Sequence, residues 1–99
     1  MPTWVSLVDV IDKDYQNMQE LASSWGEIYR ETETLPIEIE TTLALLGDYD
    51  FLCIYEAPDR ASAFDLAMIV RRHGLSLQTM EGVPIDEFGP LVNDGPSFG

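Results

Sequence analysis

Basic residues are scarce in this chain of 99 residues: five Lys and Arg stand against 18 Asp and Glu, so the net charge is -13 at pH 7. Such an excess of carboxylates repels nucleic acid and anionic membranes, and we expect neither as a partner. The acidity has two interpretations. It can be an adaptation to high salt, where repulsion between carboxylates is screened, or the ordinary character of an acidic soluble protein.

Cysteine and long apolar runs are also lacking. Cys53 is the only cysteine, so no disulfide forms within the chain and a reducing compartment is expected. No run approaches the roughly 20 apolar residues of a membrane helix, and the first residues lack the features of a secretory signal. We therefore expect a cytoplasmic protein. A hydrophobic content of 45% is enough for one core, and the length fits one domain.

Motifs for metals, cofactors and activated nucleophiles are absent from the sequence. His73 is the only histidine, and no Cys-x-x-Cys or His-x-x-x-His spacing occurs. The alternating acids of ETETLPIEIE suggest a solvated face, not a cation site. No glycine-rich phosphate loop and no nucleophile elbow is present. We expect neither a metal nor a cofactor.

The apolar pattern alternates between strand-like and helix-like segments. Four runs have strand character: TWVSLVDV, IEIETTLALLG, FLCIYEA and LSLQTMEG. Between the first two runs, apolar residues recur at helical spacing, with Asp12 or Asp14 as the N-cap and an end near residues 31–34. A second helix is predicted from an Asp59 cap to a terminating Gly74. A short helical turn and a loose tail follow the last strand.

The order β-α-β-β-α-β is the ferredoxin-like plan of an α+β protein, a four-stranded antiparallel sheet with two helices on one face. We expect this domain over residues 1–88 and a loose tail over residues 89–99. The second and third strands should pair as a hairpin through a turn at residues 47–50. Simple alternation places five second-strand residues on one face: Ile37, Ile39, Thr41, Leu43 and Leu45.

The third strand is apolar on both sides, with Phe51, Cys53 and Tyr55 on one and Leu52 and Ile54 on the other. A sheet with helices on only one side should be polar on the other, so something else covers the second face. Another copy of the chain is the simplest candidate.

We expect the face opposite the helices to be lined by Trp4, Phe51, Tyr55 and Met80. This lining can be a dimer core, a pocket for a small aromatic or apolar ligand, or both.

Two polar segments are candidates for function. In the turn, Gly47 permits a positive φ angle, Asp48 or Asp50 can bond backbone N–H groups, and Tyr49 can pack its ring. These features explain a hairpin turn, and they also allow Tyr49 or Asp50 to line a pocket at the sheet edge.

The second candidate is the basic trio of Arg71, Arg72 and His73 at the end of the second helix. Positive groups there interact favourably with the negative end of the helix dipole. As the only basic cluster of the chain, the trio can instead hold an anionic ligand or an acid of a partner subunit.

Three segments, in this order, resemble the GYD domain family: PTWVSLVDVIDKD, LALLGDYDFLCIYEAPD and LSLQTMEGVPIDEF. Gly47, Tyr49 and Asp50 stand where the residues of the family's name stand, and the resemblance spans residues 2–88. The chain departs from the pattern in DKDY after the first strand and in ETETLPIEIE. The resemblance implies a dimeric α+β barrel, in which a ferredoxin-like subunit pairs sheet to sheet with a second copy.

Two functional hypotheses follow. The first is a homodimeric small-molecule-binding or accessory module that can dock on a larger protein, with ligand contacts from Trp4, Tyr49, Asp50, Phe51, Tyr55 and Arg72. The alternative is a small cofactor-independent enzyme acting on an apolar or aromatic metabolite in the barrel cleft. In that case His73, Tyr49 or Tyr55 transfers protons.

Overall fold

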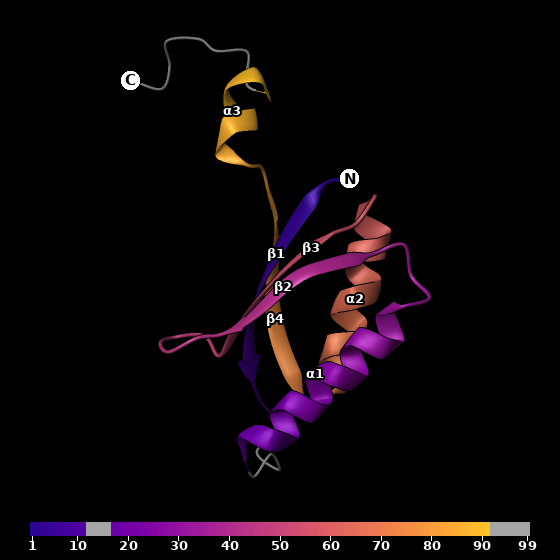
Figure 1. The fold of residues 1–99 in the computed structure, drawn as a ribbon, viewed down its shortest axis with the longest axis vertical. Coiled ribbons are helices and arrows are strands. Elements are labelled where there is room, and N and C mark those ends of the chain that lie inside the picture. Colours follow the sequence, from indigo (N-terminus) through magenta and orange to yellow (C-terminus); the bar gives the residue numbers. More distant parts are fainter. Residues whose placement is uncertain (12–16, 92–99) are drawn as a thin grey trace.

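The computed structural model describes residues 1–11 and 17–91. Its elements are β1 (Thr3–Val10), α1 (Met18–Thr32), β2 (Glu38–Ala44), β3 (Phe51–Glu56), α2 (Arg60–Arg72), β4 (Leu75–Gly82) and α3 (Ile85–Leu91). The predicted β-α-β-β-α-β order is therefore followed by one further short helix. In Figure 1, α3 lies beyond the end of the sheet, away from α1 and α2.

The four strands form one antiparallel sheet in the order β2-β3-β1-β4. The two central strands, β1 and β3, come from different halves of the chain, and β2 and β4 form the edges. The predicted hairpin of β2 and β3 is confirmed, with Leu43 opposite Leu52. Long-range pairing therefore holds both halves in one sheet.

Capping side chains set the starts of the two long helices. The Asn17 side chain accepts a hydrogen bond from the backbone N–H of Glu20 at 3.0 Å, and the Asp59 side chain accepts one from Ser62 at 2.9 Å. The Asp59 cap was predicted and is confirmed, whereas the predicted caps Asp12 and Asp14 lie outside the described residues. Gly74 ends α2 with a positive φ of 78°, a conformation that favours glycine.

Helices α1 and α2 cover one face of the sheet, and the core lies between the helices and the sheet. The fully buried side chains come from all of these layers: Val8, Ile28, Tyr55, Leu66 and Leu75. Trp25 of α1 contacts Phe51 of β3 edge to face, with ring centroids 5.5 Å apart. The two helices therefore cover the core on one face of the sheet, and the opposite face has no helix packed on it among the described residues.

The structure reverses the predicted lining of the two sheet faces. Phe51 and Tyr55 are buried beneath the helices, and Trp4, which lies opposite Tyr55, points to the same side. Of the predicted four, only Met80 lies on the face turned away from the helices, because it pairs with Val5. The prediction failed because alternation separates two faces but does not say which of two apolar faces a helix covers.

An irregularity in β2 breaks the simple alternation predicted for that strand. Ile39 lies opposite Tyr55 but Thr41 opposite Ile54, so Glu40 is an extra residue in the ladder. Ile37 and Ile39 accordingly pack against the core. Thr41 and Leu43 share the opposite face with Ile54 and Leu52, so the prediction of one shared face for all of these residues was wrong.

Over residues 1–11 and 17–91, no helix combines the length and the apolar character needed to cross a bilayer.

Truncation of a buried side chain of α2 should destabilise the fold strongly. Leu66 is 1% exposed and sits in the core, so Leu66→Ala should lower the free energy of unfolding by about 2–5 kcal/mol. The measurement is urea unfolding followed by circular dichroism. Phe64→Ala is the matched control on the same helix, because Phe64 is 68% exposed and its loss should cost less than about 1 kcal/mol. Equal losses in both variants would contradict the assignment of the buried face.

Candidate functional site

The open face, defined here as the sheet face turned away from α1 and α2, carries a continuous apolar patch. Its members are neighbours across the strands: Val5 pairs with Ile54 and Met80, and Leu52 pairs with Leu7 and Leu43. Leu43 is 50% exposed and Met80 46% exposed, and the others are half-buried in the single chain. Water-exposed sheet faces are normally polar, so an apolar patch on this face is unusual.

The turn between β2 and β3 is anchored by Asp50. Its carboxylate accepts a hydrogen bond from the backbone N–H of Val10 at 2.8 Å, and its own backbone N–H donates to the Val8 carbonyl at 2.9 Å. The sequence left Asp48 and Asp50 as alternatives for this role, and the structure assigns it to Asp50. Gly47 does not have a positive φ angle, contrary to the expectation for this turn.

Tyr49 lies at the end of the open face that adjoins the turn. Its hydroxyl donates a hydrogen bond to the Gln78 side chain of β4 at 3.2 Å. Gln78 pairs with Leu7 and therefore belongs to the open face. Tyr49 thus reaches from the hairpin turn toward the opposite edge strand.

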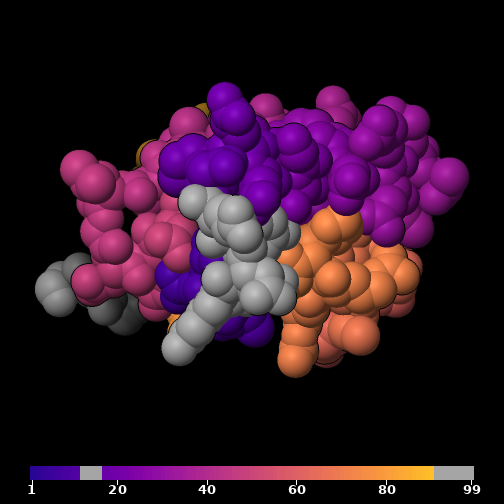
Figure 2. Space-filling view, turned by 90° about the horizontal axis from the view of Figure 1, so that it is seen from below, coloured from indigo at the N-terminus to yellow at the C-terminus, as the bar shows by residue number. Residues whose placement is uncertain are grey.

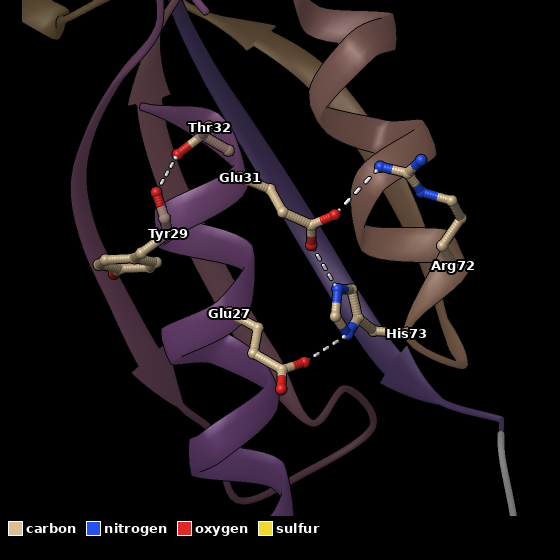
Figure 3. Close-up of polar contacts among 6 residues, drawn as sticks. All are labelled: Glu27, Tyr29, Glu31, Thr32, Arg72 and His73. Carbon is tan, nitrogen blue, oxygen red and sulfur yellow. Dashed lines mark hydrogen bonds and ion pairs between the residues drawn. The ribbon is translucent and has the colours of Figure 1, made fainter. Parts of the chain in front are cut away.

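His73 connects α2 to α1 through two carboxylates. Its Nε2 atom lies 2.6 Å from Glu31, and its Nδ1 atom lies 3.6 Å from Glu27. Figure 3 shows the imidazole between these two side chains, with Arg72 contacting Glu31 at 3.3 Å. The acids that meet Arg72 and His73 therefore come from the chain itself, and these contacts tie the two helices together. Arg71, the third member of the basic cluster, has no ion pair among the described residues.

The electrostatic consequence of this clamp is visible at Glu31. The hydrogen bond from His73 lowers the pKa of Glu31 below its usual 4.5, and the positive charge of Arg72 acts in the same direction. Glu31 is therefore held ionised in the folded protein.

Tyr55 is buried beneath the helices with a polar neighbourhood. The hydroxyls of Ser6 and Thr79 lie 2.8 Å apart beside it, yet the Tyr55 hydroxyl makes no well-aligned hydrogen bond among the described residues. Burial raises the pKa of Tyr55, and the Ser6 hydroxyl opposes this shift only in part. Burial likewise raises the pKa of the Cys53 thiol, which makes it a poor nucleophile.

The three proton-transfer candidates therefore lie in three different places. Tyr49 is at the open face, Tyr55 is beneath the helices, and His73 lies between α1 and α2. Seen from below, the turn that carries Tyr49 and the end of α2 lie on different sides of the molecule (Figure 2). Among the described residues, no group of three His, Cys, Asp or Glu side chains is placed to hold a metal ion.

A groove between α2 and the edge strand β4 was missed by the sequence analysis. It has a volume of about 430 Å³, and its lining includes Trp4, Arg60, Phe64, Met68, Arg71 and Leu77. The sequence did contain a signal for this groove. Residues 60, 64, 67, 68 and 71 share one face of α2, and this face lies outside the face that the helix buries against the core. Phe64 and Met68 lie on that face, whereas a helix face exposed to water normally carries polar side chains.

Removal of the Asp50 carboxylate should weaken the hairpin. We expect Asp50→Ala to lower the free energy of unfolding by about 1 kcal/mol, because the Val10 N–H loses its acceptor. Asp50→Asn keeps an acceptor oxygen and should recover most of the loss. Asp48→Ala in the same turn is the control and should change stability by less than about 0.5 kcal/mol. Thermal and urea unfolding measure these differences, and an equal effect of both Ala variants would refute the anchor.

The clamp at Glu31 predicts a defined pH dependence. A lowered folded-state pKa stabilises the folded protein above the unfolded value, and this contribution is lost as the pH falls below about 4.5 and through the folded-state pKa. Glu31→Gln cannot titrate. Wild type should therefore exceed this variant in stability at neutral pH, and the gap should shrink in acid. Unfolding at several pH values measures it, with Glu33→Gln as the control, and a gap that grows in acid would contradict the sign.

Several solved structures match this chain, and two of them are described here. The first is the leucine response regulatory protein LrpA of Mycobacterium tuberculosis, with a TM-score of 0.58 and 10% identity, covering 84% of this chain and 51% of that one. The chain thus spans about half the length of LrpA. An ACT domain protein of Streptococcus pneumoniae has a TM-score of 0.49 and 8% identity, covering 82% of this chain and 89% of that one. The LrpA similarity supports the α+β ferredoxin-like fold alone.

Sequence comparison adds the family. No curated protein matches the chain. The family model described as GYD domain matches residues 4–92, which is nearly the whole chain and includes the turn with Tyr49 and Asp50. The resemblance seen in the sequence is thereby confirmed, and the chain belongs to the GYD domain family.

Proposed function

We propose that this protein is a homodimeric small-molecule-binding module whose two copies pack through their open faces. The observation that supports the dimer is the apolar patch of Val5, Leu7, Leu52, Ile54 and Met80 on an otherwise uncovered side of the sheet. An identical patch on a second copy is its natural complement, because a two-fold axis brings the same surface of each copy together.

The charge of the chain makes the apolar character of this interface necessary. Each copy carries a net charge of -13, so two copies repel each other at a distance. Glu38 and Glu56 are paired at one end of the open face, and Asp9 lies near the other. Attraction therefore has to come from burial of the aliphatic centre, and added salt should strengthen the dimer by screening the acids.

A binding or regulatory role is supported by the fold and by the separate positions of Tyr49, Tyr55 and His73. The LrpA structure shows that this fold occurs in a response regulatory protein, which supports such a role here by analogy of fold only. Docking on a larger protein as an accessory subunit, and a cytoplasmic location, belong to the same proposal. The enzyme alternative stays a prediction, and of its proton-transfer candidates only Tyr49 adjoins the proposed cleft between two open faces.

A charge placed at the centre of the open face should separate the copies. Leu52 lies between Leu7 and Leu43, so Leu52→Lys would bury a charge in the interface and should weaken the dimer at least about tenfold. Light scattering across a concentration series measures this. Wild type should show twice the chain mass of 11.1 kDa, and the variant should approach the single mass.

The matched control is Leu46→Lys, because Leu46 lies in the turn and is fully exposed in the single chain. This variant should dimerise like wild type. A monomeric wild type at micromolar concentration would refute the dimer, as would a Leu52→Lys variant that retains full dimer affinity.

A further inference from the structure

We infer that the groove between α2 and β4 binds a small apolar carboxylate, whose acid group contacts an arginine and whose hydrocarbon body lies on the apolar wall. This inference specifies the ligand class of the proposed binding function. It does not depend on the dimer, because the groove lies on the helix-covered side and the dimer surface is the open face.

The apolar wall of the groove carries two large side chains that are mostly exposed. Phe64 is 68% exposed and Met68 57% exposed, although they sit one helical turn apart on the same face of α2. Residues 63 and 67 are alanines, and their short side chains leave a hollow between α2 and the sheet. Leu77 of β4 also lines this hollow. A volume of about 430 Å³ falls in the range of small-ligand sites.

The charge of the groove contrasts with the rest of the protein. Arg60 and Arg71 both line it, separated by about 16 Å along the helix at 1.5 Å per residue. In a chain with 18 acids, neither arginine side chain has a hydrogen bond or ion pair among the described residues, whereas Arg72 contacts Glu31 at 3.3 Å. Two of the few cations thus line one apolar groove, and no carboxylate of residues 1–11 or 17–91 pairs with them there.

This arrangement favours a monoanion with an apolar body. A guanidinium binds a carboxylate through two parallel hydrogen bonds. One arginine lies at each end of the groove, and either one can neutralise the single negative charge of the ligand. A phosphate monoester carries nearly two negative charges, of which a single arginine balances only one. The Thr79 hydroxyl, bonded to Ser6, adds a polar contact on the floor. A small hydrophilic acid would bury no hydrocarbon on the apolar wall, so the wall would add no affinity for such a ligand.

Decanoate, 1-decanol and decylammonium are suitable probes, because they share a chain and differ in charge. Binding is measured below the micellar range by shifts of backbone amide signals in NMR titrations. Decanoate should bind at least about tenfold more tightly than decanol and should shift the signals of α2 and β4. Decylammonium should bind least tightly in the groove. Equal affinity for acid and alcohol, no binding of decanoate, or shifts confined to the open face would overturn the inference.

Variants separate the two parts of the site. The double variant Arg60→Gln with Arg71→Gln should lose at least about tenfold in decanoate affinity and keep its affinity for decanol. Ala67→Phe should fill the hollow and weaken both probes. Arg30→Gln on α1 removes one positive charge elsewhere and is the control. Unchanged decanoate binding by the double variant, with its fold verified by circular dichroism, would refute the role of the arginines.

The monomeric Leu52→Lys variant keeps the two proposals distinguishable. If it binds decanoate like wild type, the groove acts within a single chain. If decanoate fails to bind wild type while light scattering still shows a dimer, the groove inference fails and the dimer proposal stands.

Discussion

Alternation of side chains along the central strands β1 and β3 is the constraint on which the molecule depends. Both strands carry apolar side chains on both sides, so helices on one side of the sheet cannot bury all of these side chains. The larger aromatic groups, Phe51 and Tyr55, lie beneath α1 and α2, and the aliphatic Leu52 and Ile54 face outward. The core and the open face therefore arise from alternate residues of the same two strands, and a shift of register by one residue would exchange the two faces.

Scarcity of positive charge gives each cation a larger role than it would have in an average protein. Arg72 and His73 are directed to the carboxylates of α1, where they hold two helices together at an otherwise repulsive surface. Arg60 and Arg71, on another face of the same helix, are directed to the groove beside β4. The arginines of α2 thus divide between a contact with α1 and the groove proposed to bind a ligand.

The sequence was sufficient for the elements and their order, because caps such as Asp59, the terminating Gly74 and the apolar periods are local signals. It failed where the outcome depends on packing between distant segments. Nothing local to Phe51 tells which side α1 will cover, and an extra residue such as Glu40 is decided by pairing with β3. The partners of His73 lie 42 and 46 positions away in α1, which no motif spacing reveals. The groove has the same origin, since Trp4 of β1 and Leu77 and Thr79 of β4 line it together with α2.

The two proposed surfaces lie on opposite sides of the sheet but share its strands. Trp4 lines the groove, its indole N–H donates to the Ala57 carbonyl at 3.2 Å just before α2, and its neighbour Val5 lies on the open face. Any coupling between ligand and dimer has to pass through such neighbouring pairs, and it is reciprocal: a ligand that favours the dimer is itself favoured by the dimer. Because β1 is held by pairing on both sides, it resists displacement, whereas β4 is paired on one side only. We therefore expect β4, whose Leu77 lines the groove and whose Met80 lies on the open face, to be the strand through which any such coupling passes.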